Sequence, residues 1–100
     1  MIPGKQAKEV LNIVKTWKGK PSSAWKARSD AHQRAIDSGD PFEYAKAFRE
    51  LHVMETEDAL RPQDSAHLNQ IGQLLREELA RSLNKPAKQI EKLISDALGS

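Results

Sequence analysis

Hydrophobic positions recur three and four residues apart along most of the chain, which is the spacing of one face of an α-helix. The first such stripe runs over about residues 5–17 and contains Ala7, Val10, Leu11, Val14 and Trp17. Lys18-Gly19-Lys20-Pro21 follows, and glycine and proline together interrupt a helix. We therefore expect a first helix over about residues 5–17, with Trp17 in the core.

A second helix is predicted from a cap at Ser22 or Ser23 to about Asp37, because a serine hydroxyl accepts a hydrogen bond from a free backbone N–H. It is the most polar of the predicted helices. We expect it to contact the core thinly and to present a charged outer face. Its few apolar positions are Trp25, Ala27, Ala31, Ala35 and Ile36.

The stretch Ser38-Gly39-Asp40-Pro41-Phe42-Glu43 gives the sharpest local signal. Gly39 is expected to end one helix and Asp40 to cap the next. Pro41 fits the first helical position, and Glu43 lies three residues after the cap, as in a capping box. A third helix is predicted to run to about Glu57. Its inward side chains are expected to be Phe42, Ala45, Phe48 and Leu51.

Two more helices are expected after a loop at 58–62. The fourth is predicted to start at Asp64 or Ser65, and Asn84-Lys85-Pro86 stops it. The fifth is predicted from about Pro86 to Leu98. The expected fold is an all-α compact bundle of about five helices, in one domain over residues 1–100. Residues 1–4 are interpreted as a linker or the remnant of a preceding domain, and 99–100 as a tail. The inward positions are Leu68, Ile71, Leu75, Leu79 and Leu83 of the fourth helix and Ile90, Leu93, Ile94, Ala97 and Leu98 of the fifth.

Composition agrees with a small helical domain. The hydrophobic share is 38% and only five residues are aromatic, fewer than a sheet sandwich would need. The chain contains no cysteine, which excludes disulfides and thiolate sites and fits a cytoplasmic protein. No apolar run approaches the roughly 18 residues of a membrane span.

Charge is distributed unevenly. Residues 1–34 carry eight Lys or Arg and two acids, a balance of +6, whereas residues 35–64 balance at −5 and residues 65–100 at +1. One interpretation is a set of solvated helix faces that balance each other in space. The other is a basic face directed at a polyanion.

Candidate catalytic chemistry is sparse. The three histidines, His32, His52 and His67, are not paired at the spacing that a helical metal site needs. No Gly-x-Ser-x-Gly turn or phosphate-binding glycine loop occurs. The carboxylates near the end of the third helix, at 55–58, are most simply solvated. We therefore predict no metal, no cofactor and no enzymatic activity.

Basic residues surround the two tryptophans. Lysine and arginine neutralise phosphates, and an indole ring adds a flat apolar surface that stacks on a base or enters an opened base step. Pattern alone favours burial of Trp25, because tryptophan is mostly buried on average, and leaves an exposed ring as the alternative. The candidate DNA-binding residues are Trp25, Lys26, Arg28, Lys18 and Lys20.

Three stretches resemble the C-terminal helical domain of the CarD/CdnL family of bacterial RNA polymerase-binding transcription regulators. They are Trp25-Lys26-Ala27-Arg28, similar to a helix-opening Trp-x-x-Arg; the Ser38-Gly39-Asp40 turn with Arg49-Glu50-Leu51 after it; and Leu74-Leu75-Arg76-Glu77-Glu78-Leu79-Ala80. Their order and distances fit the family over about residues 5–83.

The resemblance implies a mechanism and partners. In that family an N-terminal Tudor-like domain docks on the β subunit of RNA polymerase, and the helical domain reaches promoter DNA at the upstream fork of the open complex. The resemblance makes Trp25 a wedge in the minor groove and Arg28 a phosphate contact, with Lys26 a neighbouring contact. Lys18 and Lys20 are candidates by charge alone. Met1-Ile2-Pro3 resembles the end of the missing domain, which favours a fragment of a longer regulator; a complete chain is the alternative, and it would need another route to the polymerase.

The alternative function is a helical protein–protein interaction module without direct DNA contact. That hypothesis predicts a buried Trp25 and binding that is insensitive to salt. Polymerase holoenzyme and promoter DNA are the partners expected under the first hypothesis. The sequence does not fix the oligomeric state, and a monomer is favoured.

Overall fold

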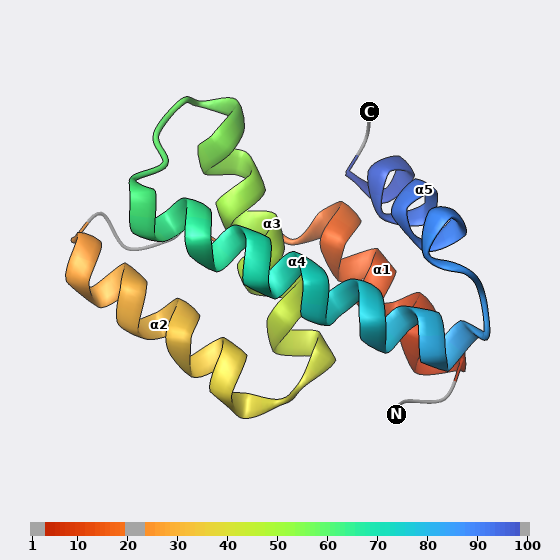
Figure 1. Ribbon diagram of the computed structural model, residues 1–100. Coiled ribbons are helices and arrows are strands. Elements are labelled where there is room, and N and C mark those ends of the chain that lie inside the picture. The colour runs from red at the N-terminus through yellow and green to blue at the C-terminus, as the bar shows by residue number, and fades with distance from the viewer. Residues whose placement is uncertain (1–3, 20–23, 99–100) are drawn as a thin grey trace.

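Five α-helices build the molecule over residues 4–19 and 24–98, which the computed structural model describes (Figure 1). This confirms the predicted all-α class. The long helix α4 packs against each of the other four, whereas α2 and α5 lie at opposite ends of the molecule. None of the described helices is both long and apolar enough to cross a membrane. The helices are α1 (Gly4–Thr16), α2 (Trp25–Ser38), α3 (Pro41–Thr56), α4 (Pro62–Leu83) and α5 (Ala87–Ala97).

The core lies between α4, α3, α1 and α5, and it consists of the apolar stripes that the sequence predicts for these helices. Leu51, Ile71 and Leu75 are fully buried where α3 and α4 meet. The two helices approach closely at Gly72, where a Cβ atom would lie 3.2 Å from the ring of Phe48. The more polar α2 packs on α3 and α4 at one side of this core.

The turn before α3 is formed as predicted in most respects. Gly39 has a positive φ of 67°, which glycine adopts without steric cost, and ends α2. The Asp40 carboxylate accepts a 2.9 Å hydrogen bond from the Phe42 N–H, and Pro41 is the first helical residue. The Asp40 N–H donates to the Ser38 hydroxyl, and Glu43 lies 3.6 Å from the Lys46 ammonium. The cap is confirmed, whereas Glu43 is not its reciprocal partner.

The predicted start of α4 at Asp64 or Ser65 is wrong, because the helix begins at Pro62. Proline suits a first helical position, where its missing N–H is not needed. Asp64 is the third residue of the helix and turns back, so that its Oδ2 accepts a 3.0 Å hydrogen bond from the Arg61 N–H. Asp64 therefore stabilises the first turn from inside the helix.

Among the apolar positions predicted for α2, Ala35 is buried in the core and Ile36 is half-buried against it, whereas the other three are exposed. The buried residues of α2 are Arg28, His32 and Ala35, whereas Trp25 and the alanines at 27 and 31 are exposed. Spacings of four and three place the buried residues on one helical face, which faces α3 and α4. The residue that precedes the helix is Ala24, and the predicted serine caps at 22 and 23 lie outside the described residues.

Candidate nucleic-acid interface

Trp25 is the first residue of α2, and 45% of its surface is exposed. The prediction of a buried Trp25, which the sequence pattern alone favours, is therefore wrong. In the described part of the chain, Trp25 and Val53 are the only large hydrophobic residues that are exposed. The Lys26 ammonium lies 5.7 Å from the centre of the Trp25 ring, within cation–π distance. The structure thus places an open indole and a cation side by side at a helix start.

The first turn of α4 lies beside the indole. Trp25 lines a shallow hollow of about 260 Å³ together with Arg61, Pro62 and Gln63. Arg61 is exposed and adds a second cation near the ring. Sequence reasoning missed this residue because the start of α4 was placed at Asp64 or Ser65, and the signal for the earlier start was Pro62 with an acid two residues later.

Arg28 points inward, away from the exposed ring. It is only 6% exposed and binds Asp64 in a bidentate pair, with Nε–Oδ1 and Nη2–Oδ2 distances of 2.9 Å. The hydrogen bond to Asp64 raises the pKa of Arg28. Burial alone would raise the pKa of Asp64, but the hydrogen bonds from Arg28 and Arg61 outweigh it and lower that pKa. A phosphate contact by Arg28 would require this pair to open.

The buried polar face of α2 continues at His32. Its Nε2 lies 3.6 Å from Glu50 Oε1 on α3, and its ring meets that of His67 on α4 edge-on, with centroids 6.2 Å apart. Burial lowers the pKa of His67, and the nearby His32 lowers it further. Two of the three buried residues of α2 therefore hold the helix through polar contacts.

Trp17 is half-buried, so its predicted place in the core is wrong. Its indole N–H donates a 3.0 Å hydrogen bond to Glu50, and the Lys46 ammonium lies 5.0 Å from its ring centre. Gly19 folds against the ring, where a Cβ atom would lie 2.6 Å from the indole carbons. Trp17 is thus tethered on several sides, in contrast to Trp25.

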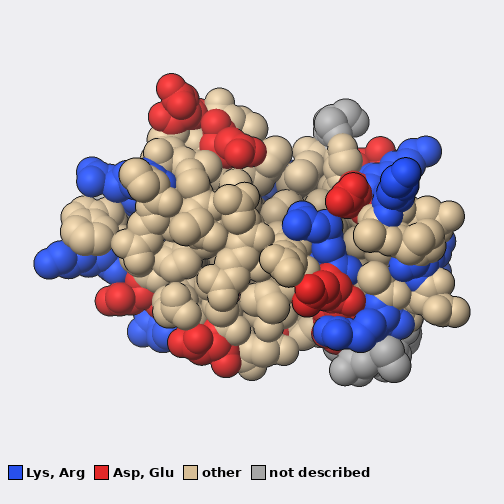
Figure 2. Space-filling model, viewed as in Figure 1, with Lys and Arg blue, Asp and Glu red and all other residues tan. Residues whose placement is uncertain are grey.

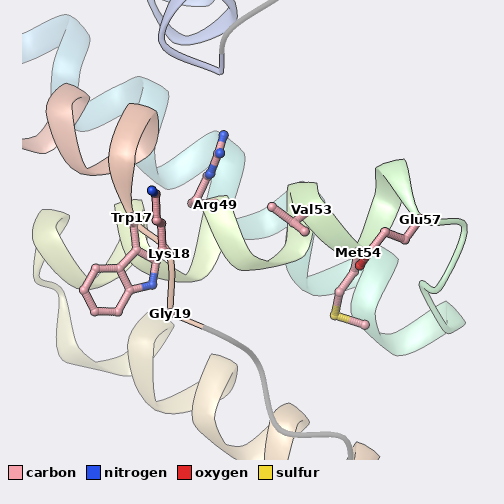
Figure 3. A pocket seen from close by; sticks show the side chains of 7 residues that line it. All are labelled: Trp17, Lys18, Gly19, Arg49, Val53, Met54 and Glu57. Carbon is pink, nitrogen blue, oxygen red and sulfur yellow. The ribbon is translucent and has the colours of Figure 1, made fainter.

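Lys18 lines a different hollow, of about 450 Å³, between the end of α1 and α3 (Figure 3). This hollow and the one beside Trp25 have no lining residue in common. Lys18 is therefore not brought into the Trp25 hollow, and Lys20 lies outside the described residues. The other lining residues of the larger hollow are Trp17, Gly19, Arg49, Val53, Met54 and Glu57.

Charge on the surface reflects the uneven charge of the sequence. In Figure 2, basic side chains flank the end of the molecule where α2 begins, and acidic side chains gather over the end of α3 and the loop that leads to α4. A broad uncharged area separates these regions from the charges over α5. The start of α2 is therefore a basic edge that carries the open indole.

Comparison with known proteins identifies the family. No curated protein matches the chain. The family model described as "CarD, C-terminal domain" matches residues 9–95, which extends the resemblance seen in the sequence to include α5. Because this match covers most of the chain, the protein belongs to the CarD C-terminal domain family, whose members are transcription regulators.

Proposed function

We propose that this chain is the DNA-contacting module of a CarD-like regulator that stabilises the open complex of RNA polymerase and promoter DNA. Trp25 enters the minor groove at the upstream fork of the bubble. The observation that carries the proposal is the exposed indole at the basic edge where α2 begins. Membership of the family supports it independently.

The physical step is a delay in re-annealing. Separated base pairs at a fork expose apolar base faces, and an indole that covers such a face has to leave before the pair re-forms. Stacking of an aromatic ring on a base is worth about 1–3 kcal/mol, which corresponds to roughly 5- to 150-fold in an equilibrium. Lys26 and Arg61, close to the ring, neutralise flanking phosphates. Lys18 and Lys20 contribute to the long-range attraction.

The test is the half-life of competitor-resistant promoter complexes formed by RNA polymerase holoenzyme, with the chain at concentrations that saturate forked DNA. The wild type is expected to lengthen this half-life, Trp25→Ala to abolish the gain, and Trp25→Phe to keep part of it. The proposal fails if the wild type and Trp25→Ala give the same half-life.

The second candidate function is a protein–protein interaction module. The exposed Val53 beside the larger hollow between α1 and α3 favours it, because apolar surface at the rim of a hollow suits a partner protein. This function predicts that Val53→Asp removes activity in transcription and that Trp25→Ala does not. The two variants together decide between the two functions.

A further inference from the structure

The start of α2 has no fully buried apolar side chain, and Trp25 is covered over only part of its surface. In residues 24–31, Arg28 is the only buried residue, and Ser29 is half-buried while the other six are exposed. A helix start without a buried apolar side chain gains little from the hydrophobic effect. The buried ion pair of Arg28 with Asp64 is therefore a main contact that holds this part of α2, together with the partly covered Trp25.

Asp64 fixes the other side of this contact. Its two carboxylate oxygens accept hydrogen bonds from Arg28, and one of them also accepts the Arg61 N–H of its own helix. The carboxylate is thus tied to the first turn of α4 before it meets the guanidinium. Because a bidentate pair constrains direction as well as distance, the start of α2 is oriented on the start of α4.

The Trp25 ring lies close to the Arg28–Asp64 pair and between the same two helices. Trp25 and Arg28 are three residues apart, so they lie one helical turn apart on neighbouring positions of α2. Pro62 and Gln63, which line the hollow beside the ring, directly precede Asp64 in the chain. The start of α2 therefore contacts the start of α4 twice. The buried Arg28–Asp64 pair makes one contact inside the fold, and the Trp25 ring makes the other at the surface.

We propose that the Arg28–Asp64 pair is a positioning pair: it orients the start of α2 and so sets the direction in which the Trp25 side chain projects from the surface. This inference rests on the proposed function of Trp25 as a wedge. The inference gives the pair no contact with DNA, because both side chains are buried. Loss of the pair should therefore impair the wedge while the basic edge keeps its affinity for DNA.

The variant that tests the inference is the double replacement Arg28→Gln with Asp64→Asn. Each replacement introduces a neutral amide that forms hydrogen bonds, and the double change avoids leaving one buried charge without its partner. The matched control is Ile94→Ala, which removes a buried side chain from α5, at the opposite end of the molecule from α2. Melting curves define a temperature at which all variants are folded.

Three readouts separate positioning from general stability. In a Trp17→Phe background, the fluorescence anisotropy of Trp25 reports how firmly its ring is held. The half-life of the open complex and the Kd for forked DNA report its action. We expect the double variant to lower the anisotropy and to shorten the half-life toward that of Trp25→Ala, with a Kd within about twofold of the wild type because the phosphate-neutralising side chains are retained. Ile94→Ala should change none of the three.

The outcomes distinguish this inference from the proposed function. If Trp25→Ala shortens the half-life and the double variant does not, the positioning role is overturned and the wedge stands. If Trp25→Ala has no effect, the wedge fails, and the anisotropy alone decides whether the pair orients the ring. Should the double variant not fold, Arg28→Lys replaces it, since lysine keeps the charge and loses the bidentate geometry. An unchanged anisotropy and half-life in Arg28→Lys would overturn the inference.

Discussion

Trp17 and Trp25 show that the neighbouring residues in the sequence do not determine whether a tryptophan is buried or exposed. Each is followed by a lysine, yet Trp17 is tethered by Glu50 and Lys46 whereas Trp25 is 45% exposed. Pattern alone placed both in the core, because spacing within a stripe does not show which partners the fold supplies. Only the family resemblance pointed to the exposure of Trp25. Arg28 was assigned to DNA by the same resemblance and turned out to face Asp64.

Replacing the two tryptophans by alanine should change the free energy of unfolding by different amounts. Trp25→Ala is expected to cost about 1 kcal/mol or less, because much of the indole is already in water. Trp17→Ala should cost more, about 2–3 kcal/mol, since it also removes the hydrogen bond to the partly buried Glu50. Urea unfolding followed by circular dichroism measures both. A larger loss for Trp25→Ala than for Trp17→Ala would show that Trp25 serves the core.

At the scale of elements, α1, α3, α4 and α5 were predictable because their apolar stripes are long and regular. The second helix was not, because two of its three buried residues are polar and a stripe search ignores them. This helix is held by contacts with residues that are distant in the sequence, such as the contact of His32 with Glu50 on α3, and the sequence alone does not reveal such pairs. The start of α4 was misplaced for a similar reason, since Asp64 caps the helix from its third position.

The stability of the fold should decrease in mild acid, because His67 on α4 is harder to protonate in the folded chain. The pKa of His67 is lowered in the fold by burial and by His32, with Asp64 acting in the opposite direction. The unfolded chain therefore binds more protons as pH falls below the ordinary value of about 6.5, and the free energy of unfolding decreases. Stability is fully present above that pH and is lost below it. Urea unfolding at pH 7.5 and 5.5 measures the difference.

A variant of His67 tests the source of this pH effect. His67→Gln should lose less stability between the two pH values than the wild type. Glu50 and Asp64 have lowered pKa values, so they titrate below this range and do not confuse the comparison. An unchanged pH dependence in His67→Gln would contradict the assignment.

The turn between α2 and α3 makes a separate prediction. Gly39 has φ of 67° with nothing within 4 Å of an added Cβ, so Gly39→Ala is strained by its backbone and not by crowding. We expect a loss of about 1 kcal/mol in the free energy of unfolding. DNA binding should be unchanged, because the turn lies at the far end of α2 from Trp25.

At the scale of the whole molecule, the uneven charge of the sequence is visible as a basic edge at the start of α2 and an acidic region near the end of α3. The sequence predicted this polarity, but not which cations lie near the ring. Lys26 and Arg61 do, whereas Lys18 lines the separate hollow on α3. Tertiary structure decided this, since Arg61 is 36 residues from Trp25 in the chain.

Salt dependence tests this arrangement. Each phosphate neutralised contributes about −0.9 to the slope of log K against log salt concentration. Lys26→Gln and Arg61→Gln should each make the slope for forked DNA less steep by about 1, and Lys88→Gln on α5 should leave it unchanged. A slope near zero for the wild type would count against the basic edge as a DNA contact.

The most direct test of the wedge is the emission of Trp25 itself. In a Trp17→Phe background, the chain is mixed with forked DNA or with fully paired DNA of the same sequence, at concentrations that saturate both. Stacking on an exposed base should quench the indole strongly on forked DNA and only weakly on the paired duplex. Equal emission on the two DNAs would contradict the entry of Trp25 into the fork.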